Sequence, residues 1–588
     1  MAVETPDGGS QGRPPGTDAW GSLASKSLIA LALAWLVACL WFPLTDTDIW
    51  WHLASAKLMW ARKAFLREDP FCLASLGVPW TDLHWGFQII AYAAWKTGGA
   101  HALVAGKCLA LAGALACSLG PHLDRRSLPW LIPLAAFGLY QVRFFIDVRP
   151  LALTLLGLSV LYWSVTAHMR GRLSRPWLIL IPVQVALVNI QGLYPLGALL
   201  VFSLLLGEWA GRRLPSVFCR ETAISPVALR PLAMTCLAMA LAGFVSPYGL
   251  QGFSLPLSLL GRIAPVASNI FSYEIAENLP FATLLKSRPG QVLPILFFCL
   301  AVLFTFDRAR GSGSSRFRIS LGHGLLFLAF AALGWMAQRN LPLVFLAGLM
   351  AAGRNLQVSQ GSHRVSDAGA RRRDAYVGWV MLLAVILVYG PKVRAAWDYE
   401  LPGAMETPFR IPAPAVDFLE AHPIPGNLFN EIRYGGYLAF RLHPGKLSFV
   451  DGRMILRSPE FYRDFLAAAD HPEGFDAYRR RYGITHALLP LSEDQRFLPL
   501  AAHLLGREGW ALLYCDGASA LLVDTAVTAA GGALPLRLDS LPQGHALPMA
   551  LRGRFGGNPR LQAMATRDAA RFLRASGRER AATDLLGP

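Results

Sequence analysis

The feature that most constrains this chain is a series of long apolar runs between residues 26 and 392. A helix needs about 20 mostly apolar residues to cross the hydrocarbon core of a bilayer. Only 16% of the 588 residues are charged, against roughly a quarter in soluble domains, and the deficit falls in these runs. We therefore predict an all-α polytopic membrane domain with about eleven transmembrane helices. The predicted spans are residues 27–44, 101–119, 128–144, 150–167, 176–190, 193–210, 231–246, 290–306, 319–337, 340–353 and 375–391.

The strongly basic loops all follow even-numbered predicted spans. Because cytoplasmic loops carry the excess of Lys and Arg, this regularity places the N-terminus and these loops in the cytoplasm. It also accounts for most of the net charge of +17, and no nucleic-acid motif is present, so no nucleic-acid partner is expected. The basic positions are Arg125 and Arg126, Arg170, Arg172 and Arg175, Arg212, Arg213, Arg220 and Arg230, Arg308, Arg310, Arg316 and Arg318, and Arg354, Arg364 and Arg371 to Arg373.

The remaining segments predict a domain order. Residues 1–26 are polar and rich in Gly and Pro, which is typical of a disordered cytoplasmic N-terminus. Residues 27–392 form the membrane domain, whose long outer loop at 45–100 contains an amphipathic interfacial helix over Leu83–Trp95. Residues 393–588 have the composition of a soluble sequence and predict a small extracytoplasmic α/β domain that ends in a basic helical tail.

Within this C-terminal domain, short apolar runs alternate with segments of helical period. Residues 458–469 predict a helix. The short apolar runs, which suit strands, are residues 447–450, 487–491, 511–514 and 520–523.

Acidic residues gather on the predicted outer face. Asp46 and Asp48 come just after the first span and directly before the aromatic stretch Ile49–His52. Carboxylates in such a place can act as a general base or bind a divalent cation, and the alternative is a pair of solvated acids beside an aromatic belt. Asp147 stands at the outer start of the fourth span, where it could also be a helix cap. Two acidic loops at one membrane face favour a site.

Other polar residues on this face are candidates for substrate binding. Arg339 lies in a tight loop between two spans, where a guanidinium suits a phosphate or could pair with one of the acids. Asn189 and Gln191 could bind sugar hydroxyls or cap a helix end. The complete set of candidates is Arg339, Arg149, His52, His84, Asn189, Gln191 and Glu274.

Four stretches carry a resemblance to a known family. They are DTDIWWHLASAKLMW from Asp46, DPF from Asp69, PWTDLHWGFQ from Pro79 and NEIRYGGYLAFRLHPGKLSFVDGR from Asn430. Together with the order of loops, they resemble the GT-C superfamily of membrane glycosyltransferases. These enzymes use polyprenyl-phosphate sugars and include the protein O-mannosyltransferases and the lipid A aminoarabinose transferases. The better-known members carry an Asp-Glu pair in the first loop, where this chain has Asp-Thr-Asp.

The resemblance implies a GT-C-like fold and a site. It implies Asp48 or Asp46 as the first-loop catalytic acid, Asp147 as the second acid and Arg339 as a ligand of the donor phosphate. The expected reaction moves a sugar, with inversion, from a polyprenyl-phosphate donor to a lipid, glycan or protein acceptor. It would take place at the outer, periplasmic face of the cytoplasmic (inner) membrane, and a divalent metal could assist but is not required.

Two other functions compete with this one. A polysaccharide polymerase or ligase would use similar chemistry. A transporter or a non-catalytic assembly protein of an envelope glycan pathway would also place charges near the membrane. A transporter would usually show paired halves and helices broken by Gly or Pro, and the sequence shows no internal repeat.

Overall fold

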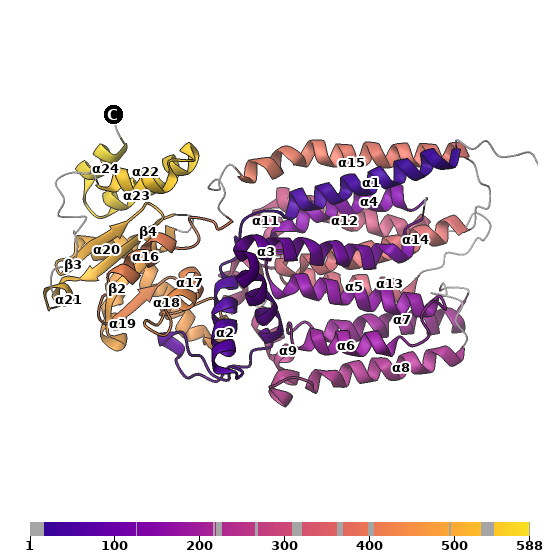
Figure 1. Ribbon diagram of the computed structural model, residues 1–588, viewed down its shortest axis with the longest axis horizontal. Helices are drawn as coiled ribbons and strands as arrows, with labels where there is room; N and C mark the ends of the chain where they lie inside the picture. The colour runs from indigo at the N-terminus through magenta and orange to yellow at the C-terminus, as the bar shows by residue number, and fades with distance from the viewer. Residues whose placement is uncertain are drawn as a thin grey trace, which may run out of the picture.

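The computed structural model has two parts, a long helical bundle and a C-terminal α/β unit at one end of it (Figure 1). Short helices lie between the two parts. The structure describes residues 17–124, 126–215, 218, 226–264, 269–308, 320–361, 368–397, 405–492, 495–530 and 546–586. The predicted disorder of residues 1–16 lies outside the described residues.

The bundle is built from helices rich in Leu, Ala, Val and Phe. Many of their large apolar side chains point outwards; Leu109 is 73% and Leu387 74% exposed. Apolar surface of this extent suits contact with lipid tails, and the chain is a multi-pass membrane protein. The helices are α1 (Thr17–Leu40), α3 (Trp85–Leu119), α4 (Leu128–Val142), α5 (Pro150–Met169), α6 (Trp177–Val188), α7 (Pro195–Arg213), α8 (Pro226–Leu241), α12 (Pro289–Arg308), α13 (Leu321–Met336), α14 (Leu341–Gly361) and α15 (Ala368–Ala396).

Each predicted span falls on one of these helices. Not every one of these helices, however, is long and apolar enough to cross a membrane by itself. Six helices in the described part of the chain are long and apolar enough to cross a membrane. A seventh would be the pair α8 and α9 (Gly249–Ile263), which is bent by 100°. Helices α6 and α13 are apolar but shorter than a full span. Eleven crossings therefore stay a prediction.

The helices alternate in direction as the loop charges predicted. Helix α1 begins, α7 ends and α15 begins at the end of the bundle away from the α/β unit (Figure 1). Arg212 and Arg213 at the end of α7, and Arg372 and Arg373 near the start of α15, therefore lie at one end of the bundle. The α/β unit and the acidic loops lie at the other.

Two boundaries differ from the predicted ones. Residues 17–26, which we expected to be disordered, form the first turns of α1, and that helix ends at Leu40, before the predicted end of the span. The predicted interfacial helix and the second span share helix α3. They are separated within it because the backbone at Gly98 and Gly99 (φ −158° and +57°) is not helical. At Gly99 the positive φ favours glycine over any other residue.

The loops at the acidic end are largely helical themselves. The first loop contains α2 (Asp48–Arg62), which the sequence analysis did not predict, and the loop after α8 contains α9, α10 (Ile270–Tyr273) and α11 (Phe281–Ser287). Helix α2 stands across the end of the bundle, between it and the α/β unit (Figure 1). Its Trp50 ring packs on Tyr437 and Phe440 of the α/β unit at 4.7 and 5.5 Å between centroids.

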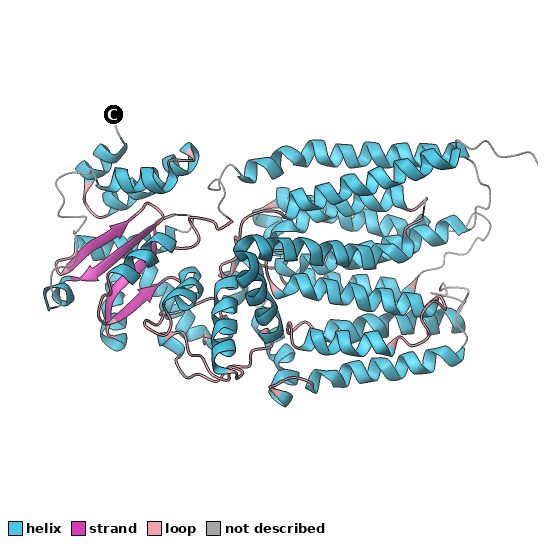
Figure 2. Ribbon diagram, viewed as in Figure 1, coloured by secondary structure: helices cyan, strands magenta, loops and turns pink. Residues whose placement is uncertain are grey.

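The α/β unit contains a four-stranded mixed sheet in the order β1-β2-β4-β3 (Figure 2). Strand β1 pairs parallel to β2, whereas β4 is antiparallel to both β2 and β3. The strands are β1 (Asn427–Asn430), β2 (Ile484–Pro490), β3 (Trp510–Cys515) and β4 (Ser519–Asp524). The helices are α16 (Ala413–Ala421), α17 (Ile432–Leu442), α18 (Pro459–Asp470), α19 (Phe475–Tyr482), α20 (Leu498–Gly506), α21 (Thr525–Ala530), α22 (Ala546–Phe555), α23 (Pro559–Ala575) and α24 (Glu579–Leu586).

Three of the four predicted apolar runs are strands β2, β3 and β4, and the predicted helix at 458–469 is α18, capped by Ser458. The run at 447–450 is not a strand of the sheet. It is extended and forms an isolated bridge with the first loop, between Ser448 and Cys72. The missed strand is β1, whose four residues are too few to show a clear alternation.

Candidate active site

The first acidic segment turns between α1 and α2 at the end of the bundle. The side chain of Asp46 is buried, and Asp48 is the first residue of α2, where a negative charge is favoured by the helix dipole. The backbone N–H of Asp48 donates to Asp46 Oδ1 at 3.0 Å. Arg410, which follows the bundle in sequence, donates to the carbonyl of Thr45 at 3.1 Å. The two predicted acids are therefore held in fixed and different surroundings.

Arg149 links Asp46 to a third acid, Glu277. Its guanidinium forms a two-point ion pair with Asp46, with one bond at 2.8 Å, and a second two-point pair with Glu277, with one bond at 2.5 Å. Burial alone would lower the pKa of Arg149, but the two carboxylates raise it well above its ordinary value. Burial likewise raises the pKa of Glu277, and Arg149 overrides this and lowers it. Arg149 is thus fully engaged by protein groups.

Asp147 holds the segment around Asp46 by hydrogen bonds. Its Oδ2 accepts the hydroxyl of Thr45 at 2.6 Å and the backbone N–H of Asp46 at 2.8 Å, and Oδ1 accepts the N–H of Val148 at 2.7 Å. Lys107 of α3 lies 3.6 Å from Oδ1, with both side chains almost fully buried. Burial raises the pKa of Asp147, but Lys107 and these donors outweigh it and lower the pKa. Asp147 is therefore a charged, structurally engaged carboxylate and not a helix cap.

Asp48 differs from these acids because no cation among the described residues forms an ion pair with it. Its side chain is only partly buried. Burial, followed by the neighbouring charge of Asp46, raises the pKa of Asp48 to about 7, although Arg149 and the indole of Trp51 oppose the shift. A carboxylate with a pKa near the working pH is suited to accept a proton from a substrate hydroxyl.

Arg339 supplies a cation that is available to a ligand. It lies in the short turn η6 (Gln338–Asn340) between α13 and α14 and is partly buried. Among the described residues it makes no hydrogen bond or ion pair, yet it lies in electrostatic range of Glu277, Arg149 and Asp48. The structure places Arg339 at the same end of the bundle as the two acidic loops, and its role as a substrate residue stays a prediction.

The two histidines lie beside Asp48 on α2 and at the start of α3. His52 is buried, its ring lies 3.6 Å from that of Trp51 between centroids at an interplanar angle of 33°, and its Nδ1 has no partner among the described residues. Burial lowers its pKa well below the ordinary value, so the ring is neutral. His84 is about one-third exposed and lies 3.5 Å from Asp82. The centroids of the two rings lie 5.4 Å apart.

Two predicted substrate residues, Asn189 and Gln191, have other partners. Asn189 accepts the indole N–H of Trp85 at 2.8 Å and donates to the carbonyls of Val185 and Val245, so it joins three segments of the bundle. Gln191 accepts the hydroxyl of Thr154 at 2.7 Å. These contacts are those of structural residues.

Glu274 lies outside the cluster of acids and pairs with Arg496 of the α/β unit at 2.7 Å. The acid of this loop that reaches the site is Glu277, three residues further on. Glu277 was not among the residues predicted from the sequence. No spacing rule separates the two, because only the turn η5 (Ala276–Asn278) decides which of them faces Arg149.

A further residue, Lys107, had a signal in the sequence. It is a lysine inside an apolar run, and charged residues in such positions are usually functional and paired. Arg410 and Glu277 had none, since they come from loops with many charges.

The acids do not form a ready metal site. In the described part of the chain, no three His, Cys, Asp or Glu side chains are placed to hold one ion. Asp46 and Glu277 share Arg149, and Asp147 lies beside Lys107, so these carboxylates already have cations. The described residues of this cluster therefore do not fit a divalent metal.

No protein-family model matches the sequence, and no curated protein is similar to it in sequence. Among solved structures, the chain is similar to the oligosaccharyltransferase AglB from Archaeoglobus fulgidus in complex with an inhibitory peptide and a dolichol-phosphate. The TM-score is 0.47 at 11% identity, covering 84% of this chain and 73% of that chain. The apo form of the A. fulgidus oligosaccharyltransferase gives a TM-score of 0.46 at 11% identity, covering 81% and 71%.

The arabinofuranosyltransferase AftD from Mycobacteria gives a TM-score of 0.47 at 13% identity, covering 92% of this chain and 44% of that chain. This chain thus spans less than half the length of AftD. The oligosaccharyltransferase and the arabinofuranosyltransferase are both GT-C membrane glycosyltransferases.

Proposed function

We propose that the protein is a membrane glycosyltransferase that moves a sugar from a polyprenyl-phosphate donor to an acceptor hydroxyl at the outer face of the cytoplasmic membrane. The observation that carries the proposal is the pair formed by Asp48 and Arg339. Among the described residues, Asp48 has no ion-pair partner and burial raises its pKa to about 7, whereas Arg339, at the same end of the bundle, makes no ion pair or hydrogen bond.

The chemistry assigns one role to each of these residues. The acceptor hydroxyl gives its proton to the Asp48 carboxylate while its oxygen forms a bond to the anomeric carbon. The bond from that carbon to the phosphate oxygen breaks, and the lipid phosphate leaves with the electron pair. Arg339 stabilises the charge that develops on the leaving phosphate. A single displacement of this kind inverts the anomeric configuration.

The other charged residues keep the two functional groups in place. Arg149 holds Asp46 and Glu277, and Asp147 holds the backbone of Asp46. With these acids compensated, Asp48 is the carboxylate that remains for base catalysis, and Asp46 is a positioning residue. The polyprenyl chain of the donor would lie among the membrane lipids, and the acceptor, a lipid, glycan or protein, would enter from the side of the α/β unit.

The proposal is tested with purified protein in lipid vesicles and a panel of radiolabelled polyprenyl-phosphate sugars. We expect the wild type to transfer or release the sugar, and we expect Asp48→Asn to lose this activity while it remains folded. Glu274→Gln, which changes an outer acid away from the site, is the matched control and should retain activity. Full activity of Asp48→Asn would remove Asp48 as the base. Absence of turnover with every donor would favour a transporter or an assembly protein.

A further inference from the structure

Asp48 is closed off on one side by a glycine of the α/β unit. A Cβ atom added to Gly452 would overlap Oδ1 of Asp48 and lie 3.2 Å from its Cγ. The φ of Gly452 is not in the left-handed region, so the backbone itself does not demand glycine there. The space that a side chain would need is instead occupied by the carboxylate of Asp48.

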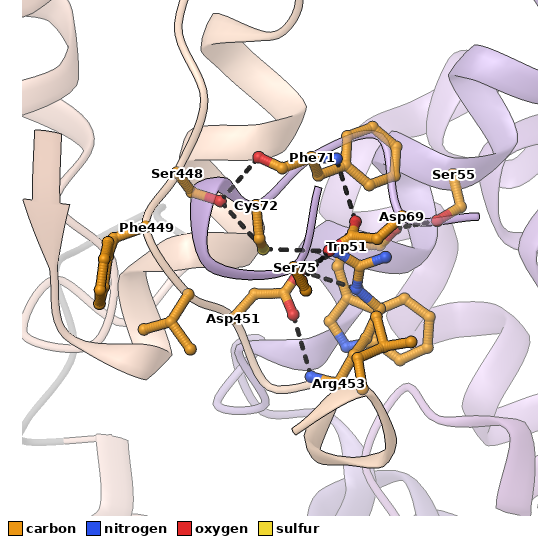
Figure 3. A network of polar contacts seen from close by, with 12 residues as sticks. Trp51, Ser55, Asp69, Phe71, Cys72, Ser75, Ser448, Phe449, Asp451 and Arg453 are labelled. Atoms are coloured by element: carbon orange, nitrogen blue, oxygen red, sulfur yellow. Dashed lines mark hydrogen bonds and ion pairs between the residues drawn. The ribbon is translucent and has the colours of Figure 1, made fainter. Parts of the chain in front are cut away.

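Gly452 is held in place by a buried ion-pair network between the two parts of the protein. Arg453 donates to Asp451 at 2.8 Å and to Asp69 of the first loop at 2.6 Å, and all three side chains are almost fully buried (Figure 3). The Arg453 guanidinium also lies over the ring of Trp80, 4.6 Å from its centroid. An arginine fixed by two carboxylates and an aromatic face leaves its neighbour Gly452 little freedom.

Hydrogen bonds from the first loop and from the Asn430 side chain hold residues 448–450, which lead to Gly452. The N–H of Ser448 donates to Phe71 at 3.1 Å, and the N–H of Leu73 donates to Ser448 at 2.7 Å. The Asn430 side chain accepts the N–H of Phe449 at 2.7 Å and donates to the carbonyl of Val450 at 2.9 Å. Direct hydrogen bonds therefore join the first loop to the α/β unit, as Figure 3 shows for Ser448 and Phe71.

A third anchor comes from the loop after α8. Arg262 of α9 donates to the carbonyls of Met454 and Arg457, at 2.8 and 2.9 Å. The first loop thus binds the residues before Gly452, and α9 binds the residues after it.

We propose that Gly452, fixed by the Asp69–Arg453–Asp451 network, is a positioning residue for the Asp48 carboxylate, so that the base is complete only when the α/β unit is docked on the first loop. This inference rests on the role of Asp48 in the proposed function. It gives the α/β unit a part in the reaction that does not depend on which acceptor it meets.

Gly452 carries no charge. It influences Asp48 because its missing side chain leaves room for the Asp48 carboxylate. The charged groups that face Asp48 come from other elements: Asp46 from its own loop, Arg149 from the start of α5, Glu277 from η5 and Arg339 from η6. A methyl group at position 452 would leave these charges in place but push the carboxylate aside. The burial that is the largest cause of the raised pKa of Asp48 would then decrease.

The first test follows the titration of Asp48 itself. Infrared difference spectra of the purified protein should contain a carboxyl band that titrates near pH 7 and that Asp48→Asn removes. In Gly452→Ala we expect the midpoint of this band to fall towards that of an ordinary aspartate. The matched control is Gly474→Ala in the same unit, where an added Cβ meets no atom within 4 Å, and it should leave the midpoint unchanged. An unchanged midpoint in Gly452→Ala overturns the inference.

The second test covers the case in which Gly452→Ala folds poorly. If the added methyl group conflicts only with the Asp48 side chain, then Gly452→Ala lowers the melting temperature of the wild type but not that of Asp48→Ala. Equal destabilisation in both backgrounds would show that Gly452 does not act through Asp48.

The third test uses activity. Gly452→Ala should lower kcat by about 100-fold, as a misplaced reacting group does, with the KM for the polyprenyl-phosphate sugar nearly unchanged. A change confined to KM would contradict a positioning role. If the wild type transfers no sugar, the proposed function fails, while the infrared and melting experiments still decide whether Gly452 positions Asp48.

Discussion

The carboxylate of Asp147 accepts the backbone N–H of Asp46 at 2.8 Å, across 101 positions of sequence. The two predicted acidic loops therefore meet directly, but through a side chain and a backbone rather than as two free carboxylates. Because Asp147 also faces Lys107 at 3.6 Å in a buried setting, its charge is used to hold the first loop. Asp48 is therefore the candidate base, and the other acids have structural roles.

Removing the charge of Asp147 should cost stability. In Asp147→Asn, the ammonium group of Lys107 stays buried without a counter-charge, which should destabilise the protein by about 3–5 kcal/mol. The double variant Lys107→Met with Asp147→Asn removes both charges and should recover most of the loss. Thermal unfolding in detergent measures both. Additive losses in the double variant would show that the two groups do not interact.

The raised pKa of Asp48 predicts a conflict between stability and activity. The folded state binds the proton more tightly than the unfolded state, so ionisation of Asp48 reduces stability as the pH rises from its ordinary pKa of 3.8 to about 7. Asp48→Asn should therefore be more stable than the wild type at pH 8, by on the order of 1–4 kcal/mol. At pH 4 the two should be nearly equal. Melting temperatures across this range test the sign, and lower stability of Asp48→Asn at pH 8 would contradict it.

The pH dependence of transfer follows from the same group. A general base must be ionised, so kcat/KM should fall as the pH decreases through about 7. The measurement is the initial rate of sugar transfer at low donor concentration between pH 5 and 9. A rate that stays level down to pH 5 would mean that the base is an acid with an ordinary pKa.

Truncation of Arg339 should mainly reduce activity, whereas truncation of Arg149 should mainly reduce stability. Arg339→Ala should unfold at nearly the wild-type temperature but lose transfer activity by about 100-fold, because it removes a cation aimed at the leaving phosphate. Arg339→Lys keeps the charge and should recover part of the rate. Arg149→Ala leaves the buried Asp46 without its partner and should cost about 3 kcal/mol or more of stability. If Arg339→Ala were the less stable of the two, Arg339 would be the structural cation.

Glu277 and Glu274 offer a matched pair of amide substitutions. Glu277→Gln weakens the hold on Arg149 and should lower kcat by about tenfold, which corresponds to ~1.4 kcal/mol. Glu274→Gln loosens a partly exposed contact with Arg496, which is worth at most about 1 kcal/mol, and should leave kcat unchanged. Transfer assays on the two variants side by side distinguish the site from the contact between the two parts. A larger effect of Glu274→Gln would restore it as a substrate residue.

The helices of the bundle could be predicted because their signal is local. Apolar runs of the right length appear in the sequence wherever a helix meets lipid, and arginines mark the loops at one end, so every predicted span falls on a helix. Helix α2 was missed because residues 49–56 are all buried, between α3 and helix α17 of the α/β unit, so no single apolar face marks it as a helix. Its pattern therefore resembles a polar loop with scattered aromatics until these partners are known.

The site could be predicted only in part. Asp46, Asp48, Asp147 and Arg339 follow from their positions at the ends of spans, and the structure brings them to the same end of the bundle. The sequence could not show which of these residues form ion pairs. The ion pairs depend on Arg149, Glu277 and Lys107, which come from other segments of the chain.

By itself, the sequence determined that the chain lies in a membrane, which end of each helix faces which end of the bundle, and where the acids gather. These properties depend on hydrophobicity and charge along short stretches, which act without long-range contacts. Only the tertiary structure decided that Asp48 forms no ion pair with the described residues and that Gly452 leaves room for its carboxylate. A carboxylate acquires its pKa from the burial and the charges around it, and here these come from segments up to about four hundred residues apart in the chain.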